Sequence, residues 1–224
     1  MKTALISGGA KRIGAQIVRT LHEDGYKVII HCHQSEEIAQ ALCHELNSKR
    51  NSSAQVVVAD LGDNEAIKKL TQTIKSLDLL VNNASVFYPT SIENSTIENW
   101  DKIININLRA PFFISTELSK VLAVNQGSIV NIIDIHSDRP LKKFSIYNIS
   151  KAGMKMLTKT LAKELAPNIR VNGISPGSIL WPQDDSQLSE KEKMIIIDRI
   201  TLKKQGSPND IAEAVLFLAD AKYI

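Results

Sequence analysis

The chain has 224 residues, of which 43% are hydrophobic and 23% charged, and this balance predicts one globular domain over 1–224. Its 27 Lys and Arg residues are scattered among 24 Asp and Glu, and a net charge of +3 in this pattern argues against a nucleic-acid partner. No apolar run is long enough for a signal-peptide core or a bilayer span, so we expect a cytoplasmic protein without a membrane partner.

Short β-branched runs alternate with longer segments of helical periodicity, which is typical of βαβ units on a parallel sheet. We predict strands over 3–7, 27–31, 55–59, 79–81, 127–133 and 170–174. Helices are predicted over about 13–24, after Ser35, over about 100–124 and 147–166, and from Pro208 onward, with a loop over 176–188. The predicted fold class is therefore α/β: a single-domain, Rossmann-type, doubly wound parallel sheet with helices on both faces.

A glycine-rich turn follows the first strand and opens a helix, in the string Ser7-Gly8-Gly9-Ala10-Lys11-Arg12-Ile13-Gly14. Glycines let the backbone turn tightly and approach a pyrophosphate, whose charge is held at the N-terminus of the following helix. The turn therefore predicts a dinucleotide site that includes Gly8, Arg12, Ile13 and Gly14.

The end of the second strand carries no acidic residue that could hold the ribose hydroxyls of NAD; its sequence is His31-Cys32-His33-Gln34-Ser35. A carboxylate would repel a 2′-phosphate, so its absence favours NADPH, and the guanidinium of Arg12 could pair with that phosphate. The two histidines could also form a strand end without a ligand role. Asp60, with the backbone of Leu61, could contact the adenine or cap a helix.

Tyr147 and Lys151 are four residues apart on a predicted helix, so both project from one face. An ammonium group beside a phenol lowers the tyrosine pKa, and Tyr147 could then pass a proton to an atom left electron-rich by hydride arrival. Asp134 ends the fifth strand beside that helix, Asn107 lies in the long helix before it, and Asn82-Asn83-Ala84 ends the fourth strand. Chance rarely produces such an ordered set.

The chain is similar to the short-chain dehydrogenase/reductase family in a set of motifs that covers nearly its whole length: Ser7-Gly8-x5-Gly14, Asn82-Asn83-Ala84, Asn107, Tyr147-x3-Lys151 and Pro176-Gly177. The resemblance implies a nicotinamide cofactor and a homotetramer built through two long helices. It also implies that Tyr147 donates the proton, Lys151 holds the nicotinamide ribose and Asn107 supports a proton-relay water. The implied cofactor contacts extend to Lys151, His31, His33, Gln34, Ser35, Asp60, Leu61, Asn83, Ala84, Ser85, Pro176, Gly177 and Ser178.

Within that family the chain resembles the pteridine reductases. Asp134 stands where most members carry Ser, and Arg12 stands where most lack Arg. The strings Asn82-Asn83-Ala84-Ser85-x-Phe87-Tyr88-Pro89-Thr90 and His31-x-His33-x-Ser35 also look like that branch, although its usual Arg is Gln34 here. We therefore predict NADPH-dependent reduction of a dihydropteridine, such as dihydrobiopterin or dihydromonapterin, to the tetrahydro form.

A pteridine is flat, aromatic and rich in hydrogen-bonding groups, so its site needs a stacking surface and polar partners. Phe87 could stack on the ring, and Asp134 beside Tyr147 could help to protonate a ring nitrogen. Phe87 could instead be a loop anchor, and Asp134 a strand-end residue that bonds a loop. The predicted substrate contacts are Arg12, Ser85, Phe87, Asp134, Tyr147, Leu180 and Trp181.

Two other functions stay open. One is an NADPH-dependent short-chain reductase of another carbonyl, such as a 3-oxoacyl, sugar or steroid ketone, against which Asp134 argues. The other is a non-catalytic NADPH-binding sensor, which would not need a proton relay.

Cys32 and Cys43 lack metal-ligand spacing, so no metal is expected. The family's seventh strand should begin near 221–224, so we expect that strand and the Gly-rich tail to be missing from this sequence.

Overall fold

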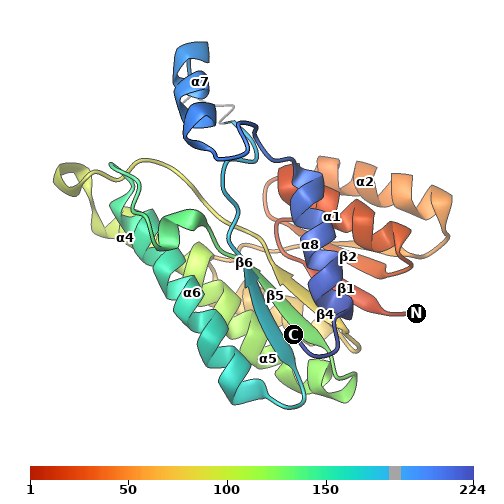
Figure 1. Cartoon of the computed structure of the whole chain (residues 1–224). Helices are drawn as coiled ribbons and strands as arrows, with labels where there is room; N and C mark the ends of the chain where they lie inside the picture. The colour runs from red at the N-terminus through yellow and green to blue at the C-terminus, as the bar shows by residue number, and fades with distance from the viewer. Residues whose placement is uncertain (182–187) are drawn as a thin grey trace.

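The computed structural model describes residues 1–181 and 188–224 (Figure 1). Within these residues, six strands form one parallel sheet in the order β3-β2-β1-β4-β5-β6. The strands are β1 (Thr3–Ile6), β2 (Lys27–Cys32), β3 (Ala54–Val58), β4 (Leu79–Asn82), β5 (Ser128–Ile132) and β6 (Arg170–Ile174). Every predicted strand is confirmed, and the Rossmann-type α/β fold with it.

Helices cover both faces of the sheet (Figure 1). One face is covered by α1 (Arg12–Glu23), α2 (Glu36–Lys49) and α8 (Pro208–Asp220), and the other by α3 (Asn64–Thr73), α5 (Ala110–Val124) and α6 (Ser145–Leu165). Both faces of the sheet are covered, so a central strand can be apolar throughout, as in the fully buried Leu79-Leu80-Val81 of β4. None of the described helices combines the length and apolarity needed to cross a membrane.

The helix predicted over about 100–124 is two helices joined by a π-helical turn. Its first part, α4 (Ile97–Ile104), runs into the turn η2 (Asn105–Arg109) and then into α5. Pro111 has no N–H group, so the carbonyl of Asn107, four residues earlier, receives no α-helical hydrogen bond. The N–H of Ala110 bonds the carbonyl of Asn105, five residues back, which widens the helix at this point.

Helix α7 (Glu190–Arg199) was not predicted. It follows the predicted loop over 176–188, of which 182–187 lie outside the described residues. A capping box marks its start: the Ser189 hydroxyl accepts from the N–H of Glu192, whose carboxylate accepts from the N–H of Ser189. None of its residues, all of which the structure describes, is buried, so its sequence lacks the apolar period of a core helix. Figure 1 shows α7 projecting from the body.

The chain changes direction across the sheet between β1 and β4. Strands β1, β2 and β3 progress toward one edge, whereas β4, β5 and β6 progress toward the other. The loops after β1 and β4 therefore run to opposite faces and leave a crevice between them at the carboxyl ends of the strands. In parallel α/β sheets this crevice is where ligands bind.

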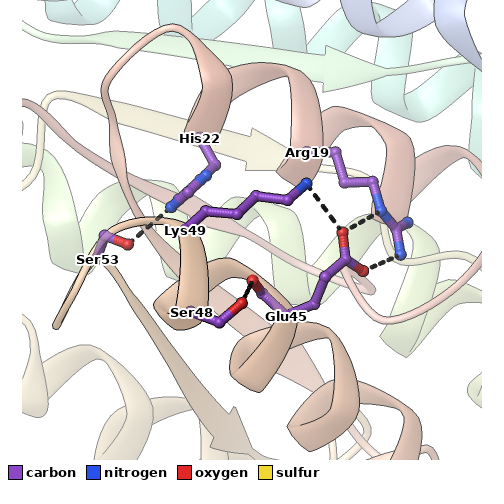
Figure 2. A network of polar contacts seen from close by, with 6 residues as sticks. All are labelled: Arg19, His22, Glu45, Ser48, Lys49 and Ser53. Atoms are coloured by element: carbon purple, nitrogen blue, oxygen red, sulfur yellow. Dashed lines mark hydrogen bonds and ion pairs between the residues drawn. The ribbon is translucent and has the colours of Figure 1, made fainter.

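Two arginines on this scaffold illustrate different kinds of polar contact. Arg19 of α1 makes a bidentate ion pair with Glu45 of α2, with nitrogen–oxygen distances of 2.8 and 3.3 Å (Figure 2). Lys49 donates to the same carboxylate. Arg170 of β6 instead donates to the backbone carbonyls of Leu218 and Ala219 at the end of α8, each at 2.7 Å. Arg170 thus supplies donors that the helix terminus lacks.

We predict that Arg170→Met lowers the free energy of unfolding by about 1–3 kcal/mol, because charged hydrogen bonds are lost and helix-end carbonyls lose their donors. Arg19→Met should cost less than about 1 kcal/mol, because the Arg19–Glu45 ion pair is partly exposed and solvent screens it. Urea denaturation of both variants beside the wild-type protein measures the difference. A loss for Arg19→Met as large as that for Arg170→Met would contradict this assignment.

Candidate active site

The turn after β1 and the segment after β4 are bonded together across the crevice. The Ser7 hydroxyl accepts from the N–H groups of Asn83 and Ala84 at 2.9 and 3.0 Å. The Asn83 side chain in turn donates to the carbonyls of Ser7 and Gly8 at 2.9 and 3.1 Å. A Cβ added at Gly14 would lie 2.1 Å from the Gly8 carbonyl oxygen, so only glycine fits there. Hydrogen bonds and close backbone packing therefore fix the position of the predicted glycine-rich turn.

The start of α1 offers backbone donors to an anion. The helix begins at Arg12, and the N–H groups of Arg12, Ile13 and Gly14 precede the first intrahelical bond. The preceding residue, Lys11, provides no side-chain cap. These amides and the helix dipole form the kind of site that binds a pyrophosphate. Arg12 has a left-handed backbone with φ of 54°, and its exposed guanidinium donates to the carbonyl of Trp181 at 3.4 Å.

His31, at the end of β2, lies inside the protein. Its Nδ1 accepts from the N–H of Gly8 and its Nε2 bonds the carbonyl of Ala59, both at 3.1 Å. Its side chain therefore has no ring nitrogen left for the predicted cofactor contact. Burial lowers the pKa of His31 from 6.5 to about 4, although the bond to Ala59 opposes the shift.

The other predicted residues after β2 and β3, apart from Leu61, are at least partly accessible. His33 and Gln34 are exposed, and the His33 ring lies 3.9 Å from the Asp60 carboxylate. Ser35 is the N-cap residue of α2, but its side chain makes no capping bond. Asp60 accepts from the N–H of Gly62 at 2.7 Å, whereas the cap of α3 is Asp63, so Asp60 is not the helix cap. Leu61 is buried in the core.

Tyr147 and Asp134 are brought together as expected. The Tyr147 hydroxyl donates to Asp134 Oδ2 at 2.7 Å, and Asp134 Oδ1 accepts from the N–H of His136 at 2.8 Å. Tyr147 is only 4% exposed. Burial, followed by the charge and hydrogen bond of Asp134, raises its pKa above the ordinary 10.0. The prediction that Lys151 lowers this pKa is therefore wrong, because burial and the neighbouring carboxylate dominate.

Lys151 lies one turn along α6, and its ammonium group is 5.6 Å from the centre of the Tyr147 ring. It donates to the carbonyl of Ile132 at 3.1 Å. Burial lowers the pKa of Lys151 from 10.5 to about 8, and the charge of Asp134 opposes part of that shift. The site thus combines a protonated phenol with an ammonium group that titrates near neutral pH.

Asn107 connects three segments around Tyr147. Its side chain accepts from the N–H of Val86 at 2.8 Å and donates to the Val86 carbonyl at 3.0 Å and to Ser150 Oγ at 3.2 Å. Ser150 donates to the backbone carbonyl of Tyr147 at 2.7 Å. Both amide hydrogens of Asn107 are thereby used. Its backbone carbonyl, which Pro111 deprives of an α-helical donor, is the group suited to bond a relay water.

Phe87 belongs to an aromatic cluster. It stacks on Phe144 with ring centres 4.4 Å apart and meets the Tyr147 ring edge-on at 4.8 Å. Phe144 was not predicted; it precedes α6 in a segment joined to Thr90 by a backbone bridge. One face of Phe87 is therefore covered within the protein, and the ring remains 43% exposed.

The remaining predicted residues border the crevice. Ser85 and Leu180 are exposed, and Trp181 is half-buried beside Arg12. After β6, the Pro176 carbonyl accepts from the N–H of Ile135 at 3.2 Å, which places Pro176 and Gly177 beside the turn of Asp134. The Ser178 carbonyl accepts from the N–H of Gly206 at 3.0 Å. In the part of the chain that the structure describes, no group of three His, Cys, Asp or Glu residues could hold a metal ion.

The family model described as enoyl-(acyl carrier protein) reductase matches residues 8–224. The chain therefore belongs to the short-chain dehydrogenase/reductase family of oxidoreductases. The 3-oxoacyl-[acyl-carrier-protein] reductases FabG of Rickettsia prowazekii and Rickettsia conorii are 35% and 36% identical over 227 residues, which cover 100% of this chain and 92% of each relative. FabG of Staphylococcus aureus is 35% identical over 230 residues, covering 100% of this chain and 93% of its own. The crystal structure of a "putative betaketoacyl-ACP reductase" aligns with a TM-score of 0.88 at 29% identity and covers 100% of this chain and 92% of that one.

These similarities confirm the family but overturn the predicted substrate. Full-length relatives and a structural neighbour are all named as 3-oxoacyl or betaketoacyl reductases, so the prediction of a pteridine reductase is wrong. The prediction rested on Asp134 and Arg12, and on the strings around Phe87 and after His31. In the structure Asp134 bonds Tyr147 and a local turn, and Phe87 stacks on Phe144, so both have partners within the chain.

We predict that His31 makes the stability of the protein fall in acid. Its pKa in the folded state lies below the ordinary 6.5, so below pH 6.5 the unfolded state binds the proton more readily. The stability that the neutral His31 ring contributes is fully present above pH 6.5 and is lost as pH falls toward 4. The loss in the free energy of unfolding is on the order of 3 kcal/mol. Urea denaturation between pH 7 and 4 should therefore show a steeper loss for the wild type than for His31→Leu. An equal loss of the free energy of unfolding in the wild type and in His31→Leu over this pH range would contradict the prediction.

Proposed function

We propose that the protein reduces a 3-oxoacyl group, carried as a thioester on an acyl carrier protein, to the 3-hydroxyacyl group with NADPH. The observation that carries the proposal is the full-length similarity to 3-oxoacyl-[acyl-carrier-protein] reductases. The crevice supports it, because a buried phenol and a buried ammonium group lie together at the carboxyl edge of the sheet.

The residues around the crevice suit NADPH. The free amides at the start of α1 would hold the pyrophosphate. The 2′-phosphate would be held by Arg12, by Gln34 and by the Ser35 hydroxyl, which makes no capping hydrogen bond. No acidic residue at the end of β2 would repel that phosphate. Lys151 would hold the nicotinamide ribose. When bound, NADPH supplies the hydride for the carbonyl carbon.

Tyr147 would deliver the proton to the carbonyl oxygen. The high pKa that burial and Asp134 impose keeps the phenol protonated, which suits a donor in the reductive direction. As the phenolate develops, the ammonium group of Lys151 offsets its charge. A water on the Asn107 carbonyl would return a proton. Because the Asp134 carboxylate would repel an alkoxide, early proton transfer from Tyr147 would favour the reduction.

We also propose the homotetramer that the family resemblance implies. Bulky apolar side chains are exposed on α4, α5 and α6, the helices around Asn107 and Tyr147, and exposed side chains of this kind are enriched at subunit interfaces. The exposed residues are Trp100, Phe112, Phe113, Ile149 and Met156.

The function is tested by following NADPH oxidation with an acetoacetyl thioester of acyl carrier protein. We expect turnover that Tyr147→Phe lowers by roughly 10²- to 10⁴-fold, because the proton donor is lost. Tyr26→Phe is a matched control, since Tyr26 is also buried and also bonds an aspartate, Asp220, but lies at the other end of the sheet. It should keep activity within about twofold of wild type. Faster turnover of a dihydropteridine than of the thioester would contradict the proposal.

A pH profile tests the charges of the site. We predict that kcat/KM for reduction is flat near pH 6–7 and falls as pH rises through about 8, where Lys151 loses its proton. Asp134 raises the pKa values of both Lys151 and Tyr147, so Asp134→Asn should move this fall to lower pH. An alkaline limb that stays in place or moves to higher pH in Asp134→Asn would refute the assigned coupling.

A further inference from the structure

We propose that His31 is a positioning residue for the dinucleotide: it holds the peptide groups of Gly8 and Gly9, so that the amides of Arg12 to Gly14 are left to face the ligand. The proposal rests on the proposed NADPH binding and assigns His31 no contact with the cofactor. It replaces the direct contact that the sequence suggested.

His31 holds two consecutive amides of the turn after β1. Its side-chain Nδ1 accepts from the N–H of Gly8 at 3.1 Å, and its backbone carbonyl accepts from the N–H of Gly9 at 2.9 Å. Gly8 has φ of +62°, a left-handed conformation that a hydrogen bond to its own N–H helps to fix. With these amides occupied, the turn has one orientation relative to the start of α1.

The same ring also connects the turn to β3. Nε2 bonds the carbonyl of Ala59, the residue before Asp60, and Ala59 itself donates to the carbonyl of Cys32. The ring of His31 therefore bridges the turn beside the proposed pyrophosphate site and the segment after β3 that could contact the adenine. At 2% exposure the side chain is closed off from solvent, and both nitrogens are engaged within the chain.

This arrangement requires one tautomer. A carbonyl oxygen only accepts, so Nε2 must carry the proton, and Nδ1 must be bare to accept from Gly8. The ionisable side chains that act on the ring are those of Asp60 and His33, both exposed, and burial favours the neutral form of His31. Nδ1 is therefore an acceptor that a side chain of similar shape without nitrogen cannot replace.

The test is NADPH affinity measured by quenching of protein fluorescence in three variants. His31→Leu keeps the bulk but removes the acceptor, and should raise the dissociation constant about 10- to 100-fold, because the Gly8 amide is left unpaired and the turn loses its orientation. His31→Asn places an amide oxygen near the position of Nδ1 and should recover most of the affinity. With saturating NADPH, kcat should change by less than about threefold, since the reacting groups are untouched.

His22→Leu is the matched control. His22 is also buried, and its Nε2 bonds Ser53 Oγ at 2.7 Å in the last turn of α1 (Figure 2). Its loss should lower the melting temperature comparably and leave NADPH affinity within about twofold of wild type. Wild-type affinity in His31→Leu, or equal weakening in His22→Leu, would overturn the positioning role. A wild-type protein that binds no NADPH would instead overturn the proposed function.

A second measurement needs no variant. Nitrogen NMR of the unliganded wild-type protein at pH 7 should show His31 as the Nε2–H tautomer, and the Gly8 amide should exchange slowly with solvent. An Nδ1–H tautomer or a rapidly exchanging Gly8 amide would overturn the proposal, even if His31→Leu fails to fold.

Discussion

The active site depends on the contact between β1 and β4, where the chain reverses its direction across the sheet. Ile6 is paired with Val81, so the next residues, Ser7 and Asn82, emerge side by side while their loops leave toward opposite faces. The Ser7 hydroxyl then bonds the backbone of the second loop. This single pairing brings a helix terminus suited to phosphate and the residues that support Tyr147 to one edge of the sheet.

Three ionisable side chains set the chemistry of that edge. Two of them, Tyr147 and Lys151, are buried side chains of α6, and Asp134 lies beside that helix. Solvent therefore screens the electrostatic interactions among the three groups only weakly. Asp134 favours the protonated form of both other groups, so the resting site holds a neutral phenol between a carboxylate and an ammonium group. A phenol held in this way is a donor more than a base, which agrees with the proposed reduction by NADPH.

The sequence alone predicted the strands well, because parallel strands covered on both faces leave uninterrupted apolar runs such as Leu79-Leu80-Val81. It missed the π-helical turn, since the effect of Pro111 falls on the carbonyl of Asn107. It also missed α7, which buries no residue. The pKa of Tyr147 was predicted in the wrong direction because burial cannot be read from a four-residue spacing. The substrate was mistaken because Asp134 and the string around Phe87 were read as features of a pteridine site, whereas Asp134 also bonds the local turn at His136 and Phe87 stacks on Phe144.

The central claim is that hydride from NADPH reaches the ketone of a 3-oxoacyl thioester beside Tyr147. Its most direct test uses NADPH deuterated at the nicotinamide C4 and acetoacetyl-acyl carrier protein, with mass spectrometry of the product. The account predicts one deuterium at C3 of the 3-hydroxyacyl product with wild-type protein, and almost no product with Tyr147→Phe. Deuterium that appears elsewhere in the acyl chain, or an undiminished yield from Tyr147→Phe, would contradict it.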